Sequence, residues 1–269
     1  MRGASAESLA DLTEALAAAV DGGADASRVA DDLFGASHIL RREPGLRRVA
    51  TDVSLAPEAK SDLLRTVFGD QLDATSVDLV ARAAGRRWAA TRDLSDALEQ
   101  LGVIAVVKAA EAQNEADALE EELFGVEQLV AQNPELRDAL SDPARSVEDK
   151  RTLVHDLLDG RATAPTIRLA EQSVTGTHRT VAVALDEYKS VAARHRNRLV
   201  GTVRVARELE EQDAQRLESA LAAQYGRPVH LNVMVDPEVI GGIKVEIGDD
   251  VIDGTVASRL DDARRRLAG

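Results

Sequence analysis

The sequence contains no cysteine, and only 2% of its 269 residues are aromatic. Without cysteine the chain has no disulfide and no thiolate metal ligand, which fits a reducing compartment. The abundant residues are instead Ala and Leu. Both are strong helix formers, and Ala lets helices approach closely, so this composition favours a core of packed helices. A chain of this length also favours two or three modules over one core.

An excess of basic residues is also missing, because 33 Lys and Arg stand against 47 Asp and Glu, a net charge of −14. Nucleic-acid binding needs a positive footprint, so we expect no nucleic-acid partner. The longest apolar runs are Ala15–Val20 and Val103–Val107, far below the roughly 18 residues of a membrane-spanning helix. Residues 1–12 lack the apolar region of a signal peptide. We therefore expect a soluble chain with no direct membrane insertion.

Signatures of enzyme chemistry are absent as well. The sequence has no HExxH, no GxSxG, no phosphate-binding GxxxxGK[ST] and no GxGxxG after a strand. No two histidines stand four residues apart, and we expect ordinary surface or capping roles for all five: His38, His155, His178, His195 and His230. We predict no catalytic residue, no cofactor-binding residue, no metal ligand and no cofactor.

The helical part of the sequence repeats itself at an offset of 90 residues. Residues 42–64 align without gaps to residues 132–154, with seven of 23 positions identical. The identical pairs are Pro44 and Pro134, Leu46 and Leu136, Arg47 and Arg137, Asp52 and Asp142, Glu58 and Glu148, Lys60 and Lys150, and Leu63 and Leu153. This similarity predicts a duplicated helical module, with bundles over 1–112 and 113–197.

Within the first copy, apolar residues at helical spacing predict helices from Leu9 to Leu40, a short one from Pro44, and another from Pro57. A further helix begins near Leu94. With no Gly or Pro to stop it, we expect that it can continue through the polar stretch Glu111–Glu122.

After Leu199 the apolar period changes from helical to two. Alternating residues predict strands over 199–206, 229–235 and 243–247, and a short run at Val251–Ile252. Helices are expected over 209–225 and after Asp253. The fold class is thus mainly α, α+β overall: two tandem helical bundles, then a small β-α-β-β-β-α domain over 198–269.

Four aspartates in the last segment could form a magnesium site, because carboxylate oxygens are the ligands that this cation prefers. They are Asp236, Asp249, Asp250 and Asp253. Each of them also stands next to a glycine, a proline or a strand end, where Asp commonly hydrogen-bonds to the backbone of a turn. We favour the structural interpretation and keep a magnesium-dependent enzyme as an alternative.

The same block resembles the signature region of the F-type ATP synthase delta subunit, called oligomycin sensitivity-conferring protein in mitochondria. The matching residues are Asp236, Ile240-Gly241-Gly242, Gly248-Asp249, Val251-Ile252-Asp253-Gly254-Thr255 and Arg259-Leu260. The resemblance implies a non-catalytic peripheral-stalk (stator) subunit at the cytoplasmic face of the cell membrane. Its implied partners are the N-terminal helices of the alpha subunits and the C-terminal region of the b subunit.

Two helical copies depart from the common pattern of that family. We expect that the second copy is an insertion and that the first copy contacts the catalytic head. A generic helical adaptor or co-chaperone is a further alternative, although it leaves the Gly- and Asp-rich block unexplained.

Overall fold

The structure, a computed structural model, describes residues 1–175, 177–195, 199–207, 209–226, 229–236, 239, 241–247 and 250–255. The chain divides into two compact units, Met1–Val191 and Ala192–Gly269. The first unit, called the helical unit here, holds both expected bundles, so their division at residue 112 stays a proposal. The second is called the C-terminal unit. The expected mainly α, α+β class is confirmed.

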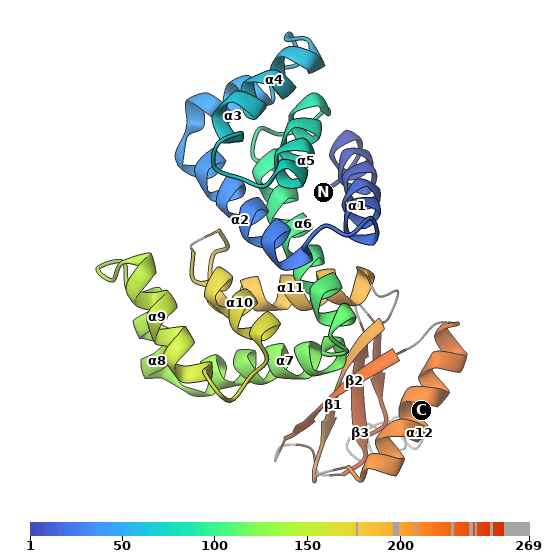
Figure 1. Cartoon of the computed structure of the whole chain (residues 1–269). Helices are drawn as coiled ribbons and strands as arrows, with labels where there is room; N and C mark the ends of the chain where they lie inside the picture. Colours follow the sequence, from blue (N-terminus) through green and yellow to red (C-terminus); the bar gives the residue numbers. More distant parts are fainter. Residues whose placement is uncertain are drawn as a thin grey trace, which may run out of the picture. The chain divides into compact units, whose positions relative to one another are not determined.

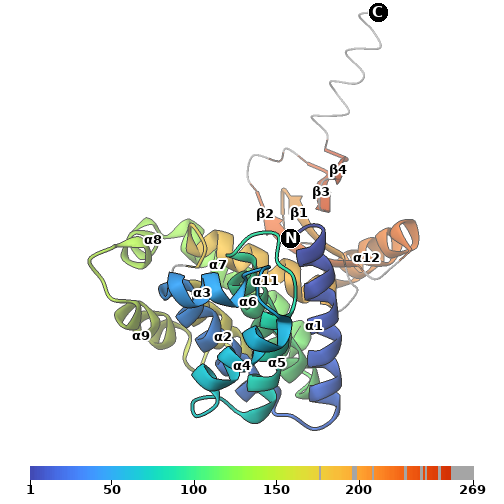
Figure 2. The same ribbon diagram turned by 90° about the horizontal axis from the view of Figure 1, so that it is seen from above.

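The helices of the helical unit, the last of which continues to His195, are drawn in Figures 1 and 2. They are α1 (Ala4–Asp21), α2 (Ala26–Arg42), α3 (Pro44–Ala50), α4 (Pro57–Phe68), α5 (Ala74–Gly85), α6 (Asp93–Ala112), α7 (Ala116–Gln132), α8 (Pro134–Ser141), α9 (Val147–Leu158), α10 (Ala164–Ser173) and α11 (Val181–His195). The starts predicted at Pro44 and Pro57 are confirmed. Among the described residues, no helix has both the length and the apolarity needed to cross a bilayer.

The helix pattern follows the 90-residue repeat. Each of α7 to α10 starts 90 residues after its counterpart in α2 to α5, and α6 starts 89 residues after α1. Helix α6 therefore stands at two repeat positions, as the last helix of the first copy and as the counterpart of α1 for the second. All seven residues of Leu101–Val107 are buried. A helix that is buried on every face must be covered from all sides, and α6 packs on α1, α2 and α5 of one copy and on α7 and α10 of the other.

The prediction that the helix beginning near Leu94 continues through Glu122 is wrong. Helix α6 ends at Ala112, and Asn114 adopts a left-handed conformation with φ 58°. The amide of Glu115 donates to the Ala110 carbonyl at 2.8 Å, and that of Asn114 to the Glu111 carbonyl at 3.1 Å. This pair of bonds is the Schellman helix end, in which Asn is tolerated at the left-handed position. Asparagine thus ends the helix where neither Gly nor Pro is present.

The C-terminal unit is a four-stranded mixed sheet with one helix packed on it (Figure 1). Its elements are β1 (Leu199–Val205), α12 (Glu211–Tyr225), β2 (Val229–Val235), β3 (Ile243–Ile247) and β4 (Asp250–Asp253), in the sheet order β2-β1-β3-β4. Strands β1 and β2 are parallel, whereas β3 is antiparallel to both β1 and β4. Val203, Val245 and Leu221 are among the residues of its core. The predicted strands and the helix between the first two are confirmed, while the helix expected after Asp253 lies outside the described residues.

Glycines of the signature block meet where β3 begins and β4 ends. Gly242 has φ +81°, and a Cβ atom built on it would stand 2.4 Å from the Gly254 carbonyl oxygen. The Gly254 amide in turn donates to the Ile243 carbonyl at 2.9 Å. Only glycine combines this backbone conformation with so close an approach. The glycines of the block therefore have a structural role: they let the start of β3 and the end of β4 pack closely together.

Candidate functional site

The structure gives the described aspartates of the magnesium alternative separate partners. Asp250 accepts a hydrogen bond from the Tyr225 hydroxyl at 3.1 Å, and Asp253 accepts from both the amide and the hydroxyl of Thr255. The bonds from Thr255 lower the pKa of Asp253. Asp236 lies 3.6 Å from Arg204, and Asp249 is outside the described residues. No group of three potential ligands suitable for a metal ion occurs among the residues that the structure describes.

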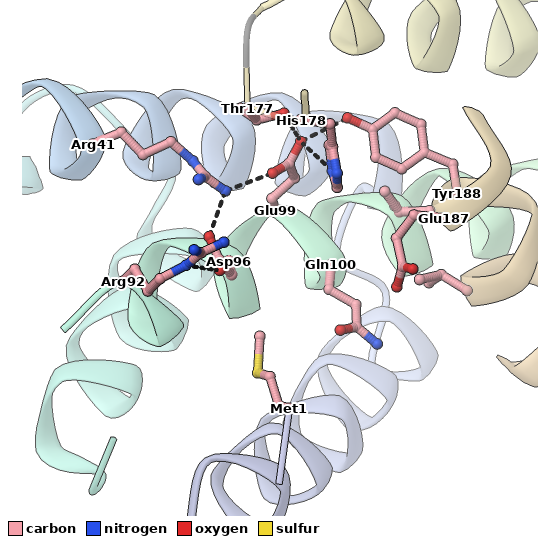
Figure 3. Close-up of a pocket in the computed structure, with 12 residues that line it drawn as sticks. Met1, Arg41, Arg92, Asp96, Glu99, Gln100, Thr177, His178, Glu187 and Tyr188 are labelled. Carbon is pink, nitrogen blue, oxygen red and sulfur yellow. Dashed lines mark hydrogen bonds and ion pairs between the residues drawn. The ribbon is translucent and has the colours of Figure 1, made fainter. Parts of the chain in front are cut away.

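Glu99 is a buried charged side chain of the helical unit with several hydrogen-bond partners. It is only 3% exposed, on α6. One carboxylate oxygen, Oε1, accepts hydrogen bonds from the hydroxyls of Tyr188 and Thr177, both at 2.6 Å, and from the Gln172 amide at 3.3 Å. Figure 3 shows Tyr188 and Thr177 beside the Glu99 carboxylate, together with His178, whose Nε2 atom lies 3.7 Å from Oε1. We call Glu99 and its bonded partners the Glu99 network.

The other carboxylate oxygen faces the first copy. Glu99 Oε2 accepts from the Arg41 guanidinium at 2.7 Å, and the same Arg41 nitrogen lies 2.8 Å from Asp96 (Figure 3). A buried carboxylate needs such donors, because an unpaired charge away from water costs several kcal/mol. One charge thus binds α2 of the first copy to α10 and α11 of the second.

Tyr188 acts in the network as a neutral donor. Burial raises the pKa of its hydroxyl above the ordinary value, and the adjacent Glu99 carboxylate raises it further. The ring also packs edge-to-face on His178, with 5.6 Å between centroids. The Tyr188 hydroxyl keeps its proton, and both Glu99 oxygens already accept hydrogen bonds. These features suit a structural connection between the two copies.

Sequence reasoning missed the Glu99 network. The partners of Glu99 lie 58 to 89 residues away along the chain, so no local motif marks it. The one available signal was a glutamate on the apolar face of a predicted helix, between Leu98 and Leu101.

A second candidate site is a shallow groove between α1 and α5, which we call the α1–α5 groove. It encloses 310 Å³, and four of its lining residues are small. The lining residues are Ala15, Ala19, Ala74, Thr75, Asp78, Leu79 and Arg82. Asp11 holds the two helices together, because it accepts two bonds from Arg82, at 2.9 and 3.0 Å. These bonds lower the pKa of Asp11.

The second copy has a related groove between α6 and α10, but this one is narrow. Its lining includes Ala109 and Ala164, each 90 residues after a lining residue of the α1–α5 groove. It holds only 50 Å³, and Ser27 at the start of α2 also lines it. Arg168 donates to the Ser27 carbonyl at 2.7 Å. The first copy thus occupies part of this groove, whereas the α1–α5 groove is open.

Three of the histidines have described contacts or line a cleft, and our expectation of surface or capping roles for all five stays a prediction. The His155 Nδ1 atom lies 2.9 Å from Glu171, and His178 packs on Tyr188. His38 lines a cleft on α2.

Comparison with known proteins adds the family. Residues 104–267 match the family model described as ATP synthase delta (OSCP) subunit. ATP synthase subunit delta of a Nocardioides species is 54% identical over all of this chain and 98% of its own length. That of Streptomyces avermitilis is 44% identical over 99% of this chain and 98% of its own length. A chain of the Toxoplasma gondii mitochondrial ATP synthase hexamer aligns to 62% of this chain and 95% of its own length with TM-score 0.34 and 16% identity, too little for any argument.

The position of the family match bears on the two copies. It begins at Ile104 within α6 and covers the second copy and the C-terminal unit. The segment before the match, residues 1–103, lies in the first copy. Our expectation that the second copy is the insertion stays a prediction. The Gly- and Asp-rich block, which the adaptor hypothesis left unexplained, lies within the match. Because the family model covers more than half of the chain, and the relatives are similar over its whole length, the chain belongs to the ATP synthase delta (OSCP) subunit family.

Proposed function

We propose that this chain is a non-catalytic stator subunit of the proton-translocating ATP synthase, in the peripheral stalk at the cytoplasmic face of the cell membrane. It connects the catalytic head to the b stalk so that the head does not turn with the rotor. Family membership supports this role. The buried α6 and the Glu99 network are stiff connections, suited to a chain that transmits torque.

The N-terminal helices of the alpha subunits bind in the α1–α5 groove under this proposal. The open groove is the observation that carries it: its small side chains let a helix backbone approach, and Ala15 and Ala19 are only half-buried. The related groove of the second copy is narrowed by Ser27. We therefore assign the head contact to the first copy, even though the family match lies on the second.

The C-terminal region of the b subunit binds the C-terminal unit. Strand β4 carries Val251 and Ile252, which are 58% and 38% exposed, and Val235 of β2 is 50% exposed. Exposed aliphatic side chains on a small sheet are suited to bind the apolar face of a partner.

Substitution of one groove residue tests the head contact. Ala15→Glu places a charge in the groove, and Ala18→Glu places the same charge on an exposed position of the same helix. We expect Ala15→Glu to weaken binding of an alpha N-terminal peptide by about tenfold or more, as loss of a buried contact does. Ala18→Glu should bind as the unchanged chain does. Equal affinities of the two variants in calorimetry would place the contact elsewhere.

A broader experiment tests the stator role itself. The chain should co-purify with alpha and b subunits when membranes are solubilised. Recovery only as a free protein would contradict the role.

A further inference from the structure

Both copies use an acidic side chain to hold the start of the helix that forms one wall of their groove. Asp32 of α2 and Glu122 of α7 stand 90 residues apart. Asp32 Oδ2 accepts a hydrogen bond at 2.9 Å from the amide of Asp73, the residue before α5. Glu122 Oε2 accepts one at 2.8 Å from the amide of Thr163, the residue before α10. The repeat therefore preserves this contact between helices.

The two copies differ in how many bonds hold that start. The same Glu122 oxygen also accepts from the hydroxyl of Thr163 at 2.7 Å and from that of Thr166 at 2.6 Å. The counterpart of Thr166 in the first copy is Ser76, which is fully buried in α5. The Ser76 hydroxyl has no hydrogen-bond partner among the residues that the structure describes. Such a buried group is unfavourable, so the start of α5 is less firmly bonded than the start of α10.

Side-chain length accounts for the difference. Aspartate is one methylene group shorter than glutamate, and Asp32 bonds the Asp73 amide without bonding the Ser76 hydroxyl. The other oxygen of Asp32 lies 3.3 Å from Arg28. The counterpart of Arg28 in the second copy is Ala118, which cannot compete for the carboxylate.

The first turns of α5 and α10 line the two grooves. Ala74 and Thr75 of α5 line the open α1–α5 groove, whereas their counterparts Ala164 and Pro165 of α10 line the groove of only 50 Å³. A segment with fewer hydrogen bonds opens at a lower cost in free energy. The open groove thus has the wall that is easier to move.

We propose that Asp32 is a positioning residue of the α1–α5 groove. Because it bonds only the amide of Asp73, the first turn of α5 adjusts when the N-terminal helix of an alpha subunit enters the groove. The corresponding wall of the second copy is fixed by Glu122. The identity of the entering helix rests on the proposed function.

Asp32→Glu tests this role in the full chain, because it gives the first copy the residue of the second. The longer side chain reaches the Ser76 hydroxyl, as Glu122 reaches Thr166. We expect the unfolding midpoint to rise by about 2 to 4 °C, the effect of one further hydrogen bond. We also expect about fivefold weaker binding of an alpha N-terminal peptide in calorimetry, since the added bond must break before the wall moves.

Three further variants separate positioning from stability. Ser76→Ala, added to Asp32→Glu, removes the new bond and should restore the affinity of the unchanged chain. Glu122→Asp should lower the unfolding midpoint but leave the affinity unchanged, because it loosens only the second copy. If the midpoint of Asp32→Glu falls instead, Arg28→Ala is added, so that both residues match the second copy.

Hydrogen exchange gives a measurement that needs no partner. In the unchanged chain, the amides of residues 74–77 should exchange faster than those of residues 164–167, and Asp32→Glu should slow the former. Equal exchange of the two segments would contradict an adjustable α5.

The binding results distinguish this inference from the proposed function. If the unchanged chain does not bind the alpha peptide, the proposed head contact is overturned and this inference with it. If it binds, and Asp32→Glu binds equally well, only the positioning role of Asp32 is overturned. Weaker binding by Asp32→Glu that Ser76→Ala restores supports the role, because a merely structural contact would not change the affinity.

Discussion

Glu99 shows how much one side chain contributes to the connection of the two copies. Its carboxylate accepts hydrogen bonds from Arg41, Thr177, Tyr188 and Gln172, all while nearly free of solvent contact. If Glu99 is removed, its partners stay buried without a hydrogen bond. The resulting loss of stability is larger than the net stability that the hydrogen bonds contributed.

We predict that Glu99→Ala lowers the free energy of unfolding by about 3 kcal/mol, as breaking a buried ion pair does. Glu99→Gln should cost less, because its amide oxygen still accepts from Tyr188 or Arg41. Urea denaturation measures both, and Glu121→Gln, at an exposed position of α7, is the control. An alanine variant as stable as this control would mean that the network carries no stability.

His155 gives a second prediction at this scale, concerning pH. Its hydrogen bond with Glu171 raises its pKa above the ordinary value of 6.5. A group whose pKa is raised on folding stabilises the protein fully below its unfolded pKa, and that contribution is lost as pH rises through the folded pKa. We expect NMR titration of the His155 ring to show a pKa above 6.5. Glu171→Gln should return it towards 6.5, and an unchanged value would exclude Glu171 as the cause.

Individual helices follow local rules, and the end of α6 is the instructive case. The starts at Pro44 and Pro57 are visible in the sequence, because proline suits the first turn of a helix. The stop at Asn114 is less visible, since asparagine also occurs within helices. Its left-handed conformation and the two Schellman bonds make it the end of α6.

A substitution at Asn114 measures what this helix end contributes. Asn114→Val should lower the free energy of unfolding by about 1 kcal/mol or more, because a β-branched side chain is unfavourable at positive φ. Asn114→Gly is the matched control and should be neutral or stabilising, since glycine adopts this conformation freely. Thermal unfolding of both variants gives the comparison. A valine variant with the midpoint of the glycine variant would show that the turn adjusts at no cost.

The whole helical unit depends on α6, which we propose is shared by the two copies. It stands at the α1 position of the repeat for the second copy and packs on α7 and α10. The predicted boundary at residue 112 assigns α6 to the first copy alone, so a second copy that begins at residue 113 lacks this helix.

A pair of fragments tests the sharing. Residues 113–197 alone should show weak, non-cooperative thermal unfolding by circular dichroism, because the apolar faces of α7 and α10 lose their cover. Residues 93–197, which include α6, should unfold cooperatively. Equal cooperativity of the two fragments would make the second copy independent of α6.

The sequence by itself determined the elements and the family. Helix and strand periods, the 90-residue repeat and the Gly- and Asp-rich block depend on residues close in the chain, where side-chain spacing and backbone preference act directly. Only the tertiary structure decided which groove is open, that α6 packs on helices of both copies, and which charge joins the copies. These features depend on Ser27 lying against Arg168 and on Tyr188 reaching Glu99. Such partners lie many turns of helix apart along the chain. The packing of helices, rather than a local sequence pattern, therefore brings them together.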